Sequence, residues 1–339
     1  MPHNTPKLTS SEIASLWTSY MQNSMSEQFL KYLLNHVEDS DFQPIIEKGH
    51  SICVNHLSQL VEIFQQEKIP VPNGFSQSDV NLNAPRLYTD TFMIHYLNHM
   101  SKAGLIGYSG FLSMSTRKDI RKIFQETLFQ TTELYDESSD VLLQKGLYVR
   151  APYIEYPEQK DYVDSKSYLR GLNPFSSKRP LNAVELSHLN LNIQNNMIGS
   201  KLSLSFAQAS PRKEVQELML RGKDISEKHI KIFTETLLDN DIQTPISADV
   251  SITNSTAEVF SDKLMIFHQC MLTAAGTGNY AMAAAASQRS DLVFNYERLS
   301  LEIGQYAKDI ASLMIKNEWL EQPPGTMDKV KLAKQKKQN

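Results

Sequence analysis

Residues 90–119 read DTFMIHYLNHMSKAGLIGYSGFLSMSTRKD, and residues 262–291 read DKLMIFHQCMLTAAGTGNYAMAAAASQRSD. Both stretches place apolar residues three and four positions apart, which is the spacing of one helix face, and both end in Ser-x-Arg-x-Asp. They agree without a gap at Met, Ile, Gly, Tyr, Ser, Arg and Asp positions. We interpret them as two copies of one helix and of the turn that follows it.

The repeat extends outward over nearly the whole chain. A shift of roughly 173 positions superposes Thr9-x-x-Glu12 on Asn182-x-x-Glu185, and both sequences are capping boxes. A small gap then aligns Asp79-Val80 with Asp249-Val250. Before that gap, the shift of roughly 173 positions also aligns Gly49, Ile52 and His56 of the second helix with Gly222, Ile225 and His229. The sequence therefore predicts an internal duplication.

Each copy is predicted to hold four long helices, because apolar residues recur at helical spacing and β-branched alternation is absent. About 18 residues connect the second helix to the third, and at ~3.3 Å per residue they reach ~60 Å, against ~42 Å for a 28-residue helix. The connection can run the height of a bundle and leave these two helices parallel, as in ferritin-like bundles. The predicted helices are 9–36, 40–67, 86–113 and 115–146 in the first copy, and 182–208, 211–240, 257–286 and 288–317 in the second.

The predicted fold class is all-α, with two tandem ferritin-like four-helix bundles. We expect the first bundle over 1–147, a proline-bearing linker over 148–180, the second bundle over 181–325 and a basic tail over 326–339. The tail is expected to be a solvated end, and docking to an anionic surface is the alternative.

Composition narrows the class of protein. The chain has 339 residues, with 34 basic and 38 acidic side chains, so nothing in its charge favours nucleic acid or an anionic membrane as the partner. Cys53 and Cys270 are the only cysteines, which excludes a disulfide scaffold and fits a reducing compartment. No signal peptide or membrane-spanning run is recognised, so we expect a cytoplasmic protein without a membrane span.

Several motifs together resemble one protein family. They are Arg179-Pro180-Leu181-Asn182, Arg221-Gly222-Lys223 with Lys228-His229, Phe260-Ser261-Asp262-Lys263-Leu264-Met265, Ser287-x-Arg289-x-Asp291-Leu292 and Trp319-Leu320-Glu321-Gln322-Pro323-Pro324. On these motifs the chain resembles the domain-of-unknown-function 3231 family of endospore-forming bacilli. The resemblance implies tandem ferritin-like bundles similar to those of spore coat protein F, a spore-associated location in the sporulating cell and no established activity.

A ferritin-like fold raises the question of a di-metal centre, which needs inward Glu and Glu-x-x-His ligands at mid-height. The second helix offers Glu47 and His50, but they lie about 180° and 120° from His56, the centre of its apolar stripe. On the third helix, His95 and His99 lie about 160° and 200° from Leu97 and are predicted to face outward. The sequence therefore argues against a di-iron oxidase. It leaves open a single iron, zinc or manganese ion at His56, at His229 or at the Glu47-His50 pair.

His56 and His229 each fall in the middle of an apolar stripe. A lone core histidine is usually neutral and hydrogen-bonded, so we expect Tyr20 to bond His56 and Thr273 to bond His229. The alternative for each is a metal ligand.

Charged and small residues at helix ends and on the third helices also have two interpretations. Asp90 and Asp262 are expected to cap their helices or to pair with Arg86 and Lys263, and the Arg-x-Asp pairs to hold the next turn. The small residues of the third helices allow either close helix packing or room for a bound molecule; they are Gly104, Gly107, Gly110, Gly276, Gly278 and the run Ala283 to Ala286.

No catalytic residue is assigned, because no phosphate loop, nucleophile elbow or thiol-imidazole signature occurs. The leading hypothesis is a non-catalytic structural or assembly protein of the spore that associates with itself or with other spore proteins, and with no nucleic acid. The alternative is a metal- or small-ligand-binding protein of vestigial oxidase ancestry. A third hypothesis is a regulatory module with an apolar pocket between its bundles.

Overall fold

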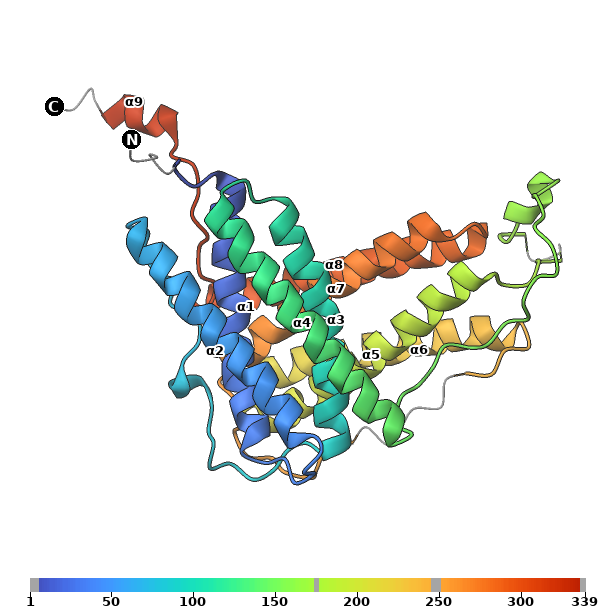
Figure 1. The fold of residues 1–339 in the computed structure, drawn as a ribbon, viewed down its shortest axis with the longest axis horizontal. Coiled ribbons are helices and arrows are strands. Elements are labelled where there is room, and N and C mark those ends of the chain that lie inside the picture. Colours follow the sequence, from blue (N-terminus) through green and yellow to red (C-terminus); the bar gives the residue numbers. More distant parts are fainter. Residues whose placement is uncertain (1–5, 174–176, 245–250, 336–339) are drawn as a thin grey trace.

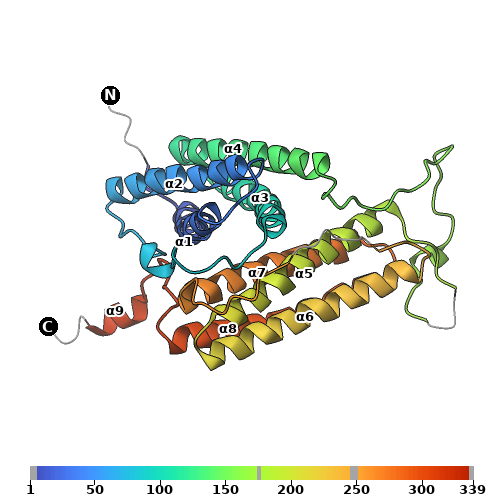
Figure 2. The ribbon, with the colours of Figure 1, turned by 90° about the horizontal axis from the view of Figure 1, so that it is seen from below.

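The computed structural model describes residues 6–173, 177–244 and 251–335. Over these residues the fold is all-α, as predicted, with no regular strand. The long helices form two tandem four-helix bundles, and Figures 1 and 2 show the bundles lying against each other with inclined axes. The long helices are α1 (Ser10–Leu34), α2 (Gln43–Gln66), α3 (Asp90–Ser113) and α4 (Lys118–Gln144) in the first bundle, and α5 (Ala183–Ala209), α6 (Lys213–Leu238), α7 (Asp262–Ala286) and α8 (Ser290–Lys316) in the second.

Contacts at the two ends of the first bundle set the direction of its helices. At one end, Arg117 before α4 pairs with Glu67 after α2 at 2.6 Å, and its backbone N–H donates to Glu12 at the start of α1. At the other end, Asp90 at the start of α3 accepts from the backbone N–H of Asp39, which precedes α2. Helices α2 and α3 are therefore parallel, and the segment between them runs the height of the bundle (Figure 1), as predicted.

The largest differences from the predicted helices are the starts of two helices and one additional short helix. Helices α3 and α7 begin at Asp90 and Asp262, not at 86 and 257, because Thr89 and Ser261 cap them and the residues before these caps are extended. The tail, expected to be an irregular end, carries the short exposed helix α9 (Lys329–Gln335).

The capping boxes at Thr9 and Asn182 are confirmed, and their glutamates have a second role. Glu12 accepts bonds from the backbone N–H groups of Thr116 and Arg117, at 2.9 and 2.7 Å. Glu185 does the same in the second bundle for Gln288 and Arg289. One carboxylate thus ties the start of a first helix to the turn before a fourth helix, where an N-terminal dipole favours negative charge.

The Arg-x-Asp pairs do hold these turns, since Arg117 pairs with Asp119 at 2.6 Å and Arg289 with Asp291 at 2.8 Å. The predicted pairing of Arg86 with Asp90 is also confirmed, at 2.6 Å.

The pairing predicted between Asp262 and Lys263 is wrong. Asp262 bonds Ser210 and Arg212, which lie in the turn between α5 and α6, while Lys263 donates to the backbone carbonyl of Gly74 in the other bundle. The sequence could not anticipate a partner that lies so far away along the chain.

The two bundles join through the segments that precede α3 and α7. The backbone N–H of Asn81 donates to the carbonyl of Val259 at 2.7 Å, and that of Thr253 donates to the carbonyl of Leu87 at 2.8 Å. A shift of 172 positions converts the first bond into the second, because it takes Asn81 to Thr253 and Leu87 to Val259. The bundles therefore meet as two copies meet in an isologous dimer.

This contact pattern corrects the repeat alignment. The bridges pair Val80 with Phe260 and Tyr88 with Ile252, so Val80 corresponds to Ile252. The sequence comparison placed it on Val250, but Asp249 and Val250 lie outside the described residues.

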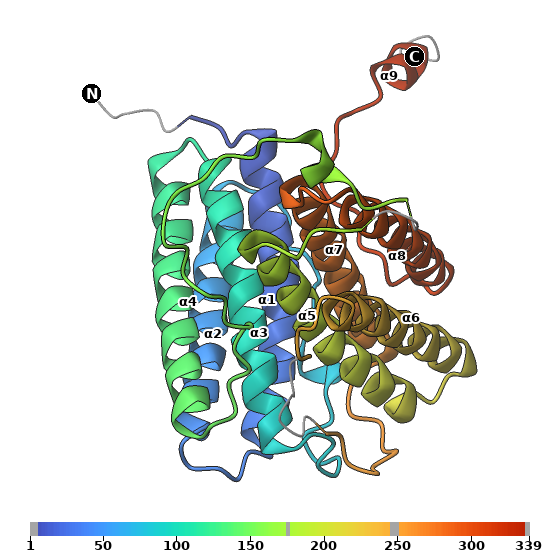
Figure 3. The ribbon, with the colours of Figure 1, turned by 90° about the vertical axis from the view of Figure 1, so that its right-hand side faces the viewer.

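A shared aromatic core fuses the bundles. Phe29 is fully buried and stacks on Phe260 with ring centroids 4.9 Å apart. The Tyr88 hydroxyl lies 2.9 Å from the Ser205 hydroxyl, and the Tyr96 hydroxyl lies 3.1 Å from His268 Nε2. Tyr96 and His268 correspond to each other under the 172-residue shift, so they lie where the two copies meet. Figure 3 shows α1 and α3 facing α5 and α7.

Candidate functional site

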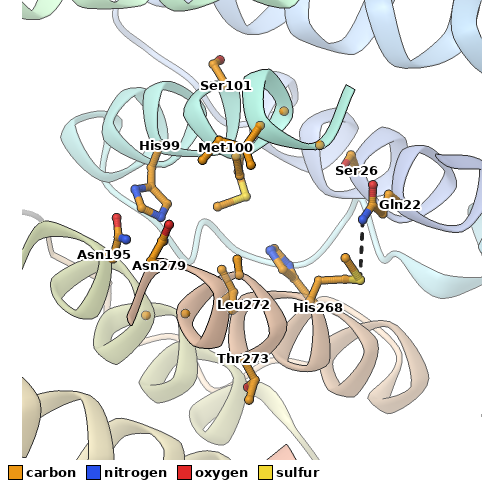
Figure 4. A pocket seen from close by; sticks show the side chains of 18 of the residues that line it. Gln22, Ser26, His99, Met100, Ser101, Asn195, His268, Leu272, Thr273 and Asn279 are labelled. Carbon is orange, nitrogen blue, oxygen red and sulfur yellow. Dashed lines mark hydrogen bonds between the residues drawn. The ribbon is translucent and has the colours of Figure 1, made fainter. Parts of the chain in front are cut away.

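A cavity of about 390 Å³ lies at the contact between the bundles (Figure 4). Met100 on α3 and Leu272 on α7 face each other across it, and these two residues correspond under the 172-residue shift. Most of the remaining lining also comes in such pairs, including Gly104 with Gly276. The cavity therefore extends from the shared contact into both bundles.

Glycines make this space. A methyl group added at Gly107 would meet no atom within 4 Å among the described residues, and one at Gly276 would only touch Ile303, at 3.6 Å. Gly222 on α6 is different, because a methyl group there would overlap the Tyr306 hydroxyl. Of the two interpretations of the small residues on the third helices, room for a molecule applies at Gly107. Close packing applies at Gly104 on α3, where a methyl group would lie 3.0 Å from a side-chain carbon of Thr131, and also at Gly222 on the second helix of its bundle.

Polar groups enter the cavity from both bundles. The Gln22 side chain donates to the Met271 sulfur at 3.9 Å (Figure 4). Asn195, which corresponds to Gln22 under the 173-position shift of the first helices, and His99, which corresponds to Met271 under the 172-residue shift, lie near the opposite wall. The buried Asn195 Oδ1 and His268 Nδ1 have no hydrogen-bond partner in the part of the chain that the structure describes. A buried polar atom without a partner costs free energy, so a ligand that bonds it would gain stability.

His268 is a neutral side chain. It is 1% exposed, and burial lowers its pKa to about 3. A neutral imidazole has one nitrogen that donates and one that accepts. Since Tyr96 occupies Nε2, His268 presents a single polar atom, Nδ1, among apolar neighbours.

One tyrosine from each bundle lines the cavity. The Tyr108 hydroxyl donates to Asn23 Oδ1 at 3.0 Å, and Asn196 Nδ2 lies 2.8 Å from the Tyr280 hydroxyl. All four residues line the cavity, and the 172-residue shift takes Tyr108 to Tyr280. Helical periodicity in the sequence did not predict that the tyrosine and the asparagine of each pair are in contact.

The predicted bond between Tyr20 and His56 is wrong. His56 Nε2 lies 2.7 Å from the Ser19 hydroxyl, and Nδ1 lies 2.8 Å from the Thr127 hydroxyl. Tyr20 packs its ring on Phe64 instead. Ser19 and Tyr20 are adjacent on α1, and Ser19 is the one that contacts His56. An estimate of height along the bundle axis does not distinguish between adjacent residues. Burial lowers the pKa of His56 to about 3, so its ring is a satisfied, neutral core group.

The predicted bond between Thr273 and His229 is also wrong. His229 Nδ1 lies 2.8 Å from the Tyr280 hydroxyl, and Nε2 lies 3.2 Å from Glu302 Oε2. Burial lowers the pKa of His229, while pairing with Glu302 acts in the opposite direction. Thr273 bonds the carbonyl of Gln269 on its own helix.

The candidate metal ligands are apart from one another. His50 Nε2 lies 3.3 Å from Glu27 Oε1, whereas Glu47 is exposed, and His56 and His229 belong to different bundles. Among residues 6–173, 177–244 and 251–335, no group of three or more His, Cys, Asp or Glu side chains is placed to hold a metal ion.

His95 and His99 do not face solvent, contrary to the prediction. Both line a second cavity of about 50 Å³, which lies against Gln194, Met197 and Ile198 of α5. Burial lowers the pKa of each histidine to about 4, and nearby Lys102 adds to the effect. Around His95 and His99, the side of α3 that points away from its own bundle is therefore covered by the other bundle.

Comparison with known proteins places these features in a family. The family described as "Protein of unknown function (DUF3231)" matches residues 1–159 and again residues 170–332. No curated protein matches the chain. Among solved structures, a Bacillus halodurans protein designated a spore coat protein is similar, with 18% identity and a TM-score of 0.40 over 44% of this chain and 98% of that chain. Among the described residues, no helix has the length and apolar character that a membrane crossing requires.

Proposed function

Since the chain belongs to the DUF3231 family, whose function is unknown, we propose that it is a non-catalytic binding protein and that the cavity between its bundles holds a small, largely apolar molecule. The observation that carries this proposal is the cavity of about 390 Å³ between Met100 and Leu272, which is lined in part by the buried His268 with its unpartnered Nδ1.

Size and packing support the proposal. Protein interiors are close-packed, and an apolar cavity of about 150 Å³ is large enough for benzene. The space here is more than twice that volume. Most of the wall surface is apolar, and Leu, Ile and Met side chains contribute to it, so a ligand would gain by removing apolar surface from water. Asn, Gln, Ser and Thr side chains also line the cavity and supply polar groups.

The test fills the cavity without disturbing the core. Gly107→Leu places a side chain where the glycine has open space, and Gly110→Leu, one turn further along α3, also meets open space but lies away from the cavity. We expect 2-methylnaphthalene to bind the wild-type protein and Gly110→Leu alike, and Gly107→Leu at least about tenfold more weakly. Circular dichroism checks that both variants are folded.

Native mass spectrometry of the purified protein gives a second measurement. We expect a retained molecule in the wild-type protein that is lost in Gly107→Leu. Failure of 2-methylnaphthalene to bind the wild-type protein saturably would overturn the proposal.

The structural or assembly role in the spore remains a separate proposal, supported by the family resemblance. One face of each bundle already packs against the other bundle, so association between chains would have to use the remaining faces. The test is to measure the mass of the purified protein at high concentration and to look for the protein in purified spores. A monomer that is absent from spores would exclude this role.

A single metal ion also remains a proposal, with His56, His229 or the Glu47-His50 pair as ligands. Metal analysis of the protein as purified, compared with a His56→Gln and His229→Gln double variant, tests it. An equal metal content in the two proteins would exclude both histidines.

A further inference from the structure

The second bundle carries a chain of hydrogen bonds from its surface to the cavity. Glu302 on α8 is partly exposed and lies 3.2 Å from His229 Nε2. His229 is fully buried, and its Nδ1 lies 2.8 Å from the hydroxyl of Tyr280, which lines the cavity. Lys228 pairs with Glu302 at 2.8 Å, and Arg298 is the other charged group near the imidazole.

The donors and acceptors in this chain can be assigned in one direction only. An ionised Glu302 accepts only, so it requires the proton of His229 on Nε2. A neutral imidazole then has a lone pair on Nδ1, which requires the Tyr280 hydroxyl to donate. The Tyr280 oxygen also accepts from Asn196 at 2.8 Å, which leaves one lone pair. At neutral pH, Tyr280 therefore presents only an acceptor to the cavity.

We propose that Tyr280 accepts a hydrogen bond from the molecule in the cavity, and that this molecule is an apolar compound bearing a hydroxyl or another hydrogen-bond donor. The proposal rests on the proposed binding function and names its ligand class. His229 and Glu302 are positioning residues, because they fix the direction of the Tyr280 hydroxyl. A carboxylate at the far end of the chain polarises each bond in turn and makes the phenol oxygen a stronger acceptor.

The first bundle lacks this series of hydrogen bonds, although it has a tyrosine and a histidine, Tyr108 and His56, at the corresponding positions. Tyr108 donates to Asn23, and His56 bonds Ser19 and Thr127 instead of the tyrosine. Gln130 stands where the second bundle has Glu302. Without a carboxylate to polarise it, Tyr108 is the weaker acceptor, and the donor of the ligand should prefer Tyr280.

Two probes of similar shape test the proposal. 2-Naphthol carries a hydroxyl where 2-methylnaphthalene carries a methyl group, so the ratio of their dissociation constants measures what the donor contributes. We expect Tyr280→Phe to lower the preference for 2-naphthol by about tenfold, the factor that one good hydrogen bond supplies. The matched Tyr108→Phe should change it by less than about twofold.

The outcomes separate the two proposals. If the wild-type protein binds neither probe, the proposed binding function fails. If both probes bind and Tyr280→Phe keeps the wild-type preference, or Tyr108→Phe loses it, the binding function stands and the assignment to Tyr280 is wrong.

A spectroscopic measurement tests the donor and acceptor roles in the hydrogen bonds from Glu302 through His229 to Tyr280. It does not depend on whether Tyr280→Phe folds. In protein labelled with ¹⁵N-histidine, the signals missing from His229→Gln identify the His229 ring. We expect its proton on Nε2 at neutral pH, and a proton on Nδ1 would overturn the proposal. Glu302→Gln, at a partly exposed position, should lower the preference for 2-naphthol by about threefold, and an unchanged preference would count against the role of the carboxylate.

Discussion

Stability should fall between pH 7 and pH 5, because buried histidines stay neutral in the folded protein; His95 and His99, with a pKa of about 4, contribute, and His56 and His268 have the lower pKa values. His56 and His268 are each 1% exposed, and burial lowers the pKa of each from 6.5 to about 3. Below pH 6.5, His56 and His268 bind protons in the unfolded chain but stay unprotonated in the folded protein. The stability from these groups is therefore complete above pH 6.5 and is lost as the pH falls toward 3.

The size of the effect follows from these pKa values. One pKa unit corresponds to about 1.36 kcal/mol, so a histidine that titrates only in the unfolded chain costs about 2 kcal/mol between pH 7 and pH 5. The two histidines together should cost about 4 kcal/mol, a large part of the stability of a typical protein.

The perturbation is to replace each histidine by glutamine, which can hydrogen-bond but does not titrate. Urea unfolding followed by circular dichroism at pH 7 and pH 5 gives the free energy of unfolding of each variant. We expect His56→Gln and His268→Gln each to reduce the fall between the two pH values by about 2 kcal/mol, whatever their stability at pH 7. Leu60→Ala is the control, because truncating this buried residue should cost the same at both pH values.

Two results would refute the reasoning. A wild-type stability that is equal at pH 7 and pH 5 would mean that the buried histidines do not resist protonation. Glutamine variants that keep the full fall would place its origin in other groups.

Three further variants test the fold. Glu185→Gln should cost about 1–3 kcal/mol in thermal unfolding, because it weakens the bonds to Arg179 and to the backbone of Gln288 and Arg289; a smaller loss would show that the neutral amide suffices. Gly278→Ala should stabilise α7 by about 0.5–1 kcal/mol, since a methyl group there meets open space, whereas Gly222→Ala should destabilise through its overlap with Tyr306. Phe29→Ala should cost about 3–5 kcal/mol and make the two bundles more accessible to protease at their contact; normal protease resistance would show that the backbone bridges alone hold them.

Local sequence determined the helices and how they end. The apolar spacing of residues 90–119 and 262–291, the two capping boxes and the length of the connection before α3 act within one bundle, so the sequence alone predicted them. The starts of α3 and α7 were misjudged because the residues before them form backbone bonds with the other bundle.

The candidate site could be predicted only in part. The sequence identified His56 and His229 as buried, since both lie on the apolar stripe of their own helices. It missed His268 and Asn195, which face the other bundle. Both third helices carry polar and small residues beside their apolar stripes, and these residues could have indicated the cavity. In the sequence, however, such a helix face cannot be distinguished from one that is exposed to solvent.

The tertiary structure alone decided where these outer faces go. Helical periodicity reports which side of a helix meets its own bundle, and on that measure His95 and His99 point away from the core. A second bundle covers them, because bonds between the segments before α3 and α7 bring the copies together across 162 to 182 positions of the chain. The cavity follows from that packing, whereas the hydrogen bonds from Glu302 through His229 to Tyr280 form within the second bundle, when α6, α7 and α8 pack together. In both cases, side chains that are distant in sequence become neighbours only in the tertiary structure.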